Sequence, residues 1–385
     1  MILHHSPSSM PRTTLHLVGL MSGSSLDGID LALCRFDFDD ALSGNALLDW
    51  KLLSTKTIPY TEIWKTRLQG APSLSGRDLW LLHTELGRLY GHVILDFLRE
   101  VDREVDAIAS HGHTVFHFPH QGTTTQIGDG AVIAGVTGAV VIDQFRSLDM
   151  ALGGQGAPLA PLGDLYFFNS YTASLNLGGI ANISVKTPRG YVAFDNGGAN
   201  QVLDALAQEA GLPFDAEGQL ARSGQLIPTM KAQADALPYY ALPYPKSLGN
   251  DWVQEVLLPI FQQPQYAIAD RLHTCCQHIA HQIAKDLQLI AEQEQLTLSA
   301  NDGLIISGGG GFNTFLCECI TQAVAPMQTT QAPAALIGFK EAAFIALAGA
   351  LRLLQQPNVL PSATGATRAA IGGAVHWGRQ GINLI

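Results

Sequence analysis

The sequence has few cysteines and few basic residues. Only 5 of its 385 residues are cysteine, an odd number without metal-ligand spacing, which argues against a disulfide framework and indicates reduced thiols in the cytoplasm. Lysine and arginine together number 22, against 33 aspartates and glutamates. The resulting net charge of −11 gives no general attraction to nucleic acid or to an anionic membrane. We therefore expect small molecules, or a second copy of the chain in a homodimer, as partners.

Long hydrophobic runs are also absent. The opening segment MILHHSPSSMPRTT holds no sustained apolar stretch and does not resemble a signal peptide. The longest apolar tract, Ala342–Leu354, is shorter than the roughly 20 residues that cross a bilayer, so we predict a buried helix there. The chain is nevertheless long enough for two domains, each with its own core.

The hydrophobic periodicity predicts an α/β protein. Leucines and aromatic residues recur at three- and four-residue intervals over Arg77–Val101, which is typical of a long amphipathic helix. A strand follows and ends in the polar run SHGHT, and such strand ends carry the sites of open α/β sheets. Further on, TASLNLGGIANISV predicts two strands that reverse at Gly178 and Gly179. The opening strands reverse in a similar way, so a second domain begins as the first did.

Three glycine-rich turns follow apolar strands: GSSLDG at Gly23, GGIAN at Gly178 and GGGGFN at Gly308. None has the lysine of the P-loop, and none fits the Rossmann pattern G-x-G-x-x-G. Glycine lets backbone amides approach phosphate oxygens closely, although any single turn of this kind is more often an ordinary tight reversal. Three such turns across both halves of the chain favour nucleotide phosphates held between two lobes.

The motifs GLMSGSSLDGID, SHGHTVFH, QIGDG, ALGGQGAPLAP, LNLGGIANIS and ISGGGGFN occur in this order. Together they resemble the anhydro-N-acetylmuramic acid kinases, which belong to the actin, hexokinase and Hsp70 superfamily. The resemblance implies two ribonuclease-H-like α/β domains flanking an ATP cleft. We expect residues 1–168 and 355–385 to form the first domain and residues 169–354 the second.

The resemblance also implies which residues bind ATP and its magnesium ion. Two glycine hairpins would hold the phosphates and a third glycine loop the adenosine. Ser24 and Ser25 would donate hydroxyl groups, and Asp27 would contact Mg²⁺ through water, because Mg²⁺ prefers carboxylate and phosphate oxygens and keeps much of its hydration. The implied ATP-binding residues are Gly23, Ser24, Ser25, Leu26, Asp27, Gly28, Ile29, Asp30, Gly178, Gly179, Gly308, Gly309, Gly310 and Asn313.

Members of the family open the 1,6-anhydro bridge of their sugar with water while the freed 6-oxygen accepts the γ-phosphoryl group. Water is a weak nucleophile, so a carboxylate must accept its proton. The resemblance places that base in FDNGGAN, at Asp195. Without the resemblance, an aspartate that caps the helix near Asn200 or holds a turn is the more ordinary interpretation.

The resemblance implies sugar contacts from Thr114 and Glu341, and Arg146 is a candidate partner for a carboxylate of the substrate. Glu341 could equally be an acid that begins an apolar helix. His111 and His113 form a less convincing catalytic pair, because no nucleophile motif accompanies them. The chain departs from the family pattern at Ser147, where an arginine is frequent, at His113, where glutamine is usual, and in the Gly-Gly-Ala run after Asn196. These departures leave the contacts to the lactyl group open.

The expected function is therefore an ATP-dependent kinase that acts on anhydro-N-acetylmuramic acid in the cytoplasm during peptidoglycan recycling. Two alternatives remain. The first is a kinase for another sugar, because a fold cannot name its substrate. The second is a nucleotide-binding regulator that has lost catalysis, which the presence of Asp195 and Glu341 disfavours.

Overall fold

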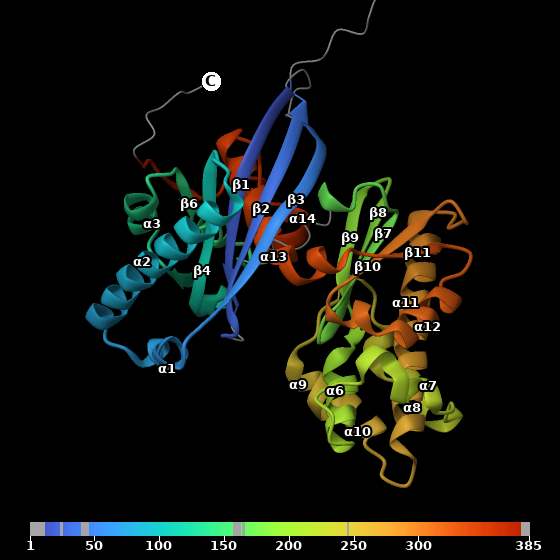
Figure 1. Ribbon diagram of the computed structural model, residues 1–385. Coiled ribbons are helices and arrows are strands. Elements are labelled where there is room, and N and C mark those ends of the chain that lie inside the picture. The colour runs from blue at the N-terminus through green and yellow to red at the C-terminus, as the bar shows by residue number, and fades with distance from the viewer. Residues whose placement is uncertain are drawn as a thin grey trace, which may run out of the picture. The chain divides into compact units, whose positions relative to one another are not determined.

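The computed structural model describes residues 12–23, 26–39, 46–156, 163, 166–244 and 246–378 (Figure 1). The backbone divides into two compact units, one containing the residues before Phe168 and those from Phe339 onward, the other Phe168–Gly338. The expected domain ranges, with their second boundary after residue 354, stay a prediction. In the structure, the chain returns to the first unit at Phe339.

The described residues of the first unit form a seven-stranded sheet in the order β12-β6-β4-β1-β2-β3, with β5 on β4. Strands β1, β2 and β3 are antiparallel, β4 is parallel to β1, and β6 is parallel to β4. The bounds are β1 (Arg12–Ser22), β2 (Gly28–Asp39), β3 (Ala46–Pro59), β4 (Ala107–Phe118), β5 (Thr123–Ile127), β6 (Val141–Asp143) and β12 (Ala374–His376).

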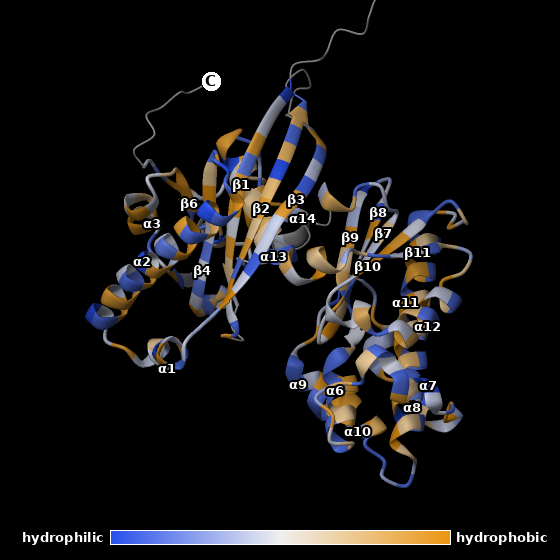
Figure 2. Ribbon diagram, viewed as in Figure 1, coloured by the Kyte–Doolittle hydropathy of each residue, from blue (hydrophilic) through white to orange (hydrophobic). Residues whose placement is uncertain are grey.

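Helices cover both faces of this sheet. The predicted helix over Arg77–Val101 is confirmed as α2 (Gly76–Val101), which Ser75 caps by accepting the Asp78 amide. Figure 2 shows polar and apolar residues interspersed along α2, as in an amphipathic helix. Its buried side chains pack with Val18 and Leu20 of β1. The other described helices of this unit are α1 (Glu62–Gly70), α3 (Gly130–Thr137), α4 (Ser147–Ala151), α14 (Pro361–Thr364) and the part of α13 (Ala334–Leu353) from Phe339.

Helix α13 packs against the opposite face of β1. A Cβ atom at Gly19 would lie 1.8 Å from the Ala342 carbonyl oxygen, and one at Gly349 would lie 2.7 Å from the Ala109 side chain. Glycine therefore lets the helix approach the sheet closely. Because side chains alternate along a strand, Gly19 faces α13 while its neighbours Val18 and Leu20 face α2.

The sequence-based interpretation of α13 needs a correction. The apolar tract Ala342–Leu354 is too short for a bilayer, whereas the helix begins at Ala334 and is 20 residues long. Within the described ranges it is the one helix with the length and composition of a membrane span. Its most apolar window is 67% buried, which agrees with the prediction of a buried helix.

The second unit contains a five-stranded sheet in the order β11-β10-β7-β8-β9. Its strands are β7 (Ala173–Leu177), β8 (Ile180–Thr187), β9 (Gly190–Gly198), β10 (Gly303–Ser307) and β11 (Gln328–Gln331). The long helix α11 (Ile268–Glu294) contributes buried residues to the core of this unit. The remaining described α-helices are α6 (Asn200–Glu209), α7 (Gln219–Ser223), α8 (Pro228–Asp235), α9 (Asn250–Trp252), α10 (Leu258–Phe261) and α12 (Thr314–Ala323).

The two sheets share one topology. In each, three antiparallel strands are followed by two strands that are added in parallel on the other side of the first strand. The order β3-β2-β1-β4-β6 of the first unit thus matches β9-β8-β7-β10-β11 of the second. This is the ribonuclease-H-like arrangement, so the predicted fold class is confirmed.

Candidate active site

The first glycine turn joins β1 to β2. The two strands pair up to Met21 and Asp30, and within the turn the Leu26 amide donates to the Gly23 carbonyl at 3.4 Å. Leu26 has a φ of 59°, an uncommon value for a residue with a side chain. The predicted hydroxyl donors Ser24 and Ser25 lie outside the described residues.

Two carboxylates accompany this turn. Asp27 is exposed, and Asp30 accepts a hydrogen bond from the Thr57 hydroxyl. Burial raises the pKa of Asp30, the Thr57 hydrogen bond lowers it, and the negative charge of Asp27 raises it further. A cation between these carboxylates would relieve that repulsion.

Asp27 and Asp30 fit Mg²⁺ better than a metal ion whose ligands all come from the protein. Among the described residues, no cluster of three or more His, Cys, Asp or Glu side chains could hold a metal ion. Mg²⁺ is commonly held by one or two carboxylates together with water and substrate phosphates. Asp27 would therefore bind only an ion that a nucleotide brings with it.

In the middle of β4, His111 is joined to Arg146. The Arg146 Nε–H donates to His111 Nε2 at 2.8 Å, while His111 Nδ1 lies 3.0 Å from the Gly112 carbonyl oxygen. Because a carbonyl can only accept, the proton of the neutral imidazole is on Nδ1. Burial, followed by the positive charge of Arg146, lowers the pKa of His111 to about 3. His111 is thus a neutral acceptor that orients Arg146.

Glu341 interacts with Arg146 through its charge. Burial lowers the pKa of Arg146, and the negative charge of Glu341 raises it. Helix α13 begins seven residues before Glu341, so this residue is not at the start of the helix as a whole. The backbone leaves helical geometry at Phe339, however, with φ −118° and ψ 17°. Glu341 therefore lies just after an interruption in the helix and is exposed.

The neighbouring residues of β4 have different partners. Thr114 Oγ1 accepts a hydrogen bond from Gln126 on β5 at 3.3 Å. His113 Nδ1 lies 3.4 Å from the Ser22 hydroxyl, which also contacts the Tyr60 hydroxyl at 2.8 Å. Burial lowers the pKa of His113. His111 and His113 therefore take part in different hydrogen bonds.

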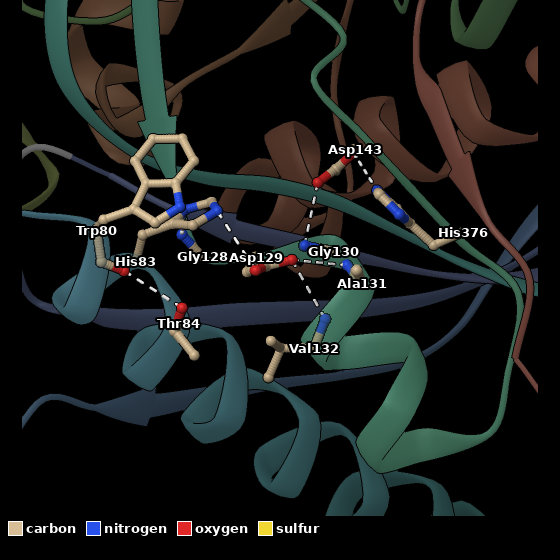
Figure 3. A network of polar contacts seen from close by, with 10 residues as sticks. All are labelled: Trp80, His83, Thr84, Gly128, Asp129, Gly130, Ala131, Val132, Asp143 and His376. Atoms are coloured by element: carbon tan, nitrogen blue, oxygen red, sulfur yellow. Dashed lines mark hydrogen bonds and ion pairs between the residues drawn. The ribbon is translucent and has the colours of Figure 1, made fainter.

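The QIGDG motif supports the beginning of α3 (Figure 3). Asp129 caps this helix by accepting the amides of Ala131 and Val132 at 2.9 and 3.2 Å. The amide of Gly130 donates to Asp143 at 3.1 Å, and Asp143 in turn lies 2.9 Å from His376 Nε2 on β12. These contacts give the motif a structural role in this unit.

In the second unit, the second glycine turn and the third glycine loop lie against each other. Gly308 has a φ of 84°, and a Cβ atom there would lie 2.7 Å from the Leu177 carbonyl oxygen. A Cβ at Gly179 would lie 2.9 Å from the Gln201 side chain. Asn313 caps α12 by accepting the Leu316 amide at 2.9 Å. Backbone packing thus requires glycine at Gly308, whereas at Gly179 the close neighbour is a side chain.

Asp195 lies on β9 directly opposite Asn182 of β8. Asn182 Nδ2 donates to Asp195 Oδ1, and the Leu248 amide donates to Oδ2 at 3.0 Å. Burial raises the pKa of Asp195, and these two donors lower it. Helix α6 has Ala199 at its N-cap and no side-chain capping bond. The alternative in which Asp195 caps that helix is therefore wrong.

A buried ion pair supports the Asp195 segment and was not identified from the sequence. Lys246 Nζ lies 3.0 Å from Asp286 Oδ1, and Asn196 donates to the other carboxylate oxygen at 2.7 Å. The Lys246 carbonyl accepts the Asp195 amide at 3.1 Å. Lys246 and Asp286 are 40 positions apart and belong to no motif, so no local pattern signalled this pair.

The comparisons with known proteins agree with the motifs. Residues 15–378 match the family model for anhydro-N-acetylmuramic acid kinase. Similar relatives include anhydro-N-acetylmuramic acid kinases from Bacillus cereus strains Q1 and ZK / E33L, each 30% identical over 94% of this chain and 99% of the relative. The chain therefore belongs to the anhydro-N-acetylmuramic acid kinase family, a family of phosphotransferases.

Solved structures give weaker similarities. Xylulose kinase from Rhodospirillum rubrum is 12% identical, with a TM-score of 0.40 over 88% of this chain and 90% of that chain. Component A of the (R)-2-hydroxyglutaryl-CoA dehydratase of Acidaminococcus fermentans is 10% identical, also with a TM-score of 0.40, over 86% of this chain and 96% of that chain.

Proposed function

We propose that this protein uses ATP to convert 1,6-anhydro-N-acetylmuramic acid to N-acetylmuramic acid 6-phosphate, in the cytoplasmic recycling of peptidoglycan. Family membership supports the substrate class. The observation that carries the chemistry is the Asp195 carboxylate, partly buried and held through both oxygens by the Asn182 amide and the Leu248 N–H.

Asp195 would act as the general base. It would accept a proton from the water molecule whose oxygen bonds to the anomeric carbon. The bond from that carbon to the bridging oxygen breaks, and its electron pair stays on this 6-oxygen. The 6-oxygen then bonds to the γ-phosphorus of ATP, and ADP leaves with the electron pair of the broken P–O bond. Burial raises the pKa of Asp195 above its ordinary value, which makes it a stronger base.

The sugar would bind through Thr114, Arg146 and Glu341. Because the Arg146 Nε–H is engaged by His111, the two terminal nitrogens form the fork that would bind the lactyl carboxylate. Glu341 stabilises the charge of Arg146 and is exposed, so its carboxylate could accept from a sugar hydroxyl. Anionic recognition by Arg146 would distinguish this substrate from a neutral hexose.

The glycine turns would hold the nucleotide. The hairpin from Gly23 to Asp30, with Ser24 and Ser25, and the turn at Gly178 and Gly179 would contact the phosphates through backbone amides and hydroxyls. The loop Gly308–Gly310 and Asn313 would hold adenosine. Asp27 would hold Mg²⁺ through water, and the bound ion would offset the phosphate charge.

The test incubates the full-length protein with Mg²⁺, ATP and 1,6-anhydro-N-acetylmuramic acid, then measures ADP and the mass of the sugar product. The expected product exceeds the substrate by one water and one HPO₃ unit, and chelation of Mg²⁺ abolishes its formation. ADP release with glucose but not with the anhydro sugar would identify a kinase for another sugar. Tight ATP binding without turnover on any sugar would identify a regulator.

A further inference from the structure

Three polar residues of the second unit lie in register on neighbouring strands. Asn176 of β7 is opposite Asn182 of β8, and Asn182 is opposite Asp195 of β9. Asn176 Nδ2 donates to Asn182 Oδ1 at 3.4 Å, and Asn182 Nδ2 donates to Asp195 Oδ1. The three side chains therefore form a continuous polar ladder across β7, β8 and β9.

A β-bulge brings Asp195 into this ladder. Ala181 pairs with Gly197, whereas the next residue, Asn182, pairs with Asp195, so Asn196 is the extra residue on β9. Asn196 donates instead to the buried Asp286 carboxylate at 2.7 Å. A bulge of this kind re-aims side chains beside a site. Here it lets Asp195 contact Asn182 while Asn196 is anchored to the core.

The ladder fixes which end of the Asn182 amide faces Asp195. The amide has one acceptor atom and one donor group. Because Asn182 Oδ1 accepts from Asn176, its Nδ2 is the group that donates to Asp195. Leu248 donates to the other carboxylate oxygen. Each oxygen of Asp195 still has a lone pair that can accept a proton. The two hydrogen bonds, one to each oxygen, hold the plane of the carboxylate.

We propose that Asn182 is a positioning residue for the Asp195 base and that Asn176 orients the Asn182 amide. This inference rests on the proposed function, because it assumes that Asp195 accepts the proton from water. Asn176 comes two residues before Gly178, and a Cβ atom at Gly308 would lie 2.9 Å from Asn176 Oδ1. The same ladder therefore connects the base with both glycine turns of this unit.

The experiment measures kcat/KM against pH for wild type and for Asn182→Leu and Asn182→Asp. Both substitutions remove the donor that lowers the pKa of Asp195, so the pKa of the base rises. The acid limb of the profile is expected to move to higher pH by about one unit. We also expect kcat to fall about tenfold, as for loss of a hydrogen bond to a charged group, while the KM for ATP changes little.

Asn176→Leu is expected to shift the limb in the same direction by a smaller amount, because it acts through Asn182. Ser184→Ala, on β8, is the matched control and should leave the profile unchanged. Circular dichroism melting identifies which Asn182 variants are folded. A folded Asn182 variant with the wild-type acid limb and wild-type kcat would overturn the inference.

Asp195→Asn separates this outcome from failure of the proposed function. If Asp195→Asn keeps most of its rate, the assignment of the base is wrong, and the role of Asn182 falls with it. If Asp195→Asn is inactive and the folded Asn182 variants behave as wild type, only the positioning role is wrong.

Discussion

The Nε–H of Arg146 donates to Nε2 of His111 at 2.8 Å, across 35 positions of sequence. The Nδ1 atom of this imidazole faces the Gly112 carbonyl oxygen, so the ring is neutral and holds the guanidinium in one orientation. This arrangement gives His111 a role that the histidine spacing in SHGHT did not indicate.

Substrate affinity is expected to depend on this pair. Arg146→Met should raise the KM for the anhydro sugar about 10- to 100-fold, because it removes charge-assisted hydrogen bonds worth about 1.5–3 kcal/mol. His111→Leu should raise the same KM less, and His111→Gln, which offers an acceptor oxygen, should be closer to wild type. Steady-state kinetics at saturating ATP measure these values. An unchanged sugar KM in Arg146→Met would contradict the assignment.

The stability of the protein should fall as the pH drops below about 6.5. The pKa of buried His111 is lowered to about 3, so between these two values the unfolded chain binds a proton that the folded chain does not. The free energy of unfolding therefore rises with pH across this window. At pH 5 His111 lowers the free energy of unfolding by about 2 kcal/mol relative to neutral pH. Urea unfolding at pH 5 and pH 7 should show a smaller pH difference in His111→Gln than in wild type.

Asp195→Asn should reduce turnover by about 10²- to 10⁴-fold, because it removes the proton acceptor. ATP affinity should stay close to wild type, since the change spares the glycine turns. Single-turnover formation of ADP and equilibrium binding of ATP provide the two measurements. Asp204→Asn, on α6 of the same unit, is the control and should retain activity. Weak ATP binding in Asp195→Asn would indicate a damaged site instead of a lost base.

Gly308→Ala should lower both stability and ATP affinity. The residue has a φ of 84°, and its Cβ would lie 2.7 Å from the Leu177 carbonyl oxygen. Gly211→Ala is a matched control, because Gly211 has a φ of 76° but no atom within 4 Å of its Cβ position. The left-handed backbone alone should cost about 1 kcal/mol in the control, and the added collision should cost more in Gly308→Ala. Equal urea midpoints for the two variants would refute the steric argument.

Local patterns in the sequence were sufficient for the long helix α2 and for the turn at Gly178. The apolar spacing that predicted Arg77–Val101 is a property of one helix face, and α2 spans Gly76–Val101. The paired glycines at Gly178 likewise predicted a reversal, which joins β7 to β8. The ordered motifs identified the family, and the shared strand order of both units confirmed the fold class.

The contacts within the candidate site depended on tertiary structure. The resemblance assigned Asp195 its proposed role, but no sequence pattern identified its partner Asn182, because a one-residue bulge in the β8–β9 pairing sets which residues face each other. The sequence placed Glu341 at the head of a helix, whereas α13 begins at Ala334 and leaves helical geometry at Phe339.

The sequence by itself determined the family, the fold class and the kinds of chemical group available. Periodicity and motif order are recognisable in short stretches of the chain, without knowledge of how distant stretches pack. Only the folded chain decided that His111 holds Arg146, that Asn182 faces Asp195 and that Lys246 pairs with Asp286. These pairs join residues from separate elements, and their geometry follows from strand register and burial, which no short stretch of sequence specifies.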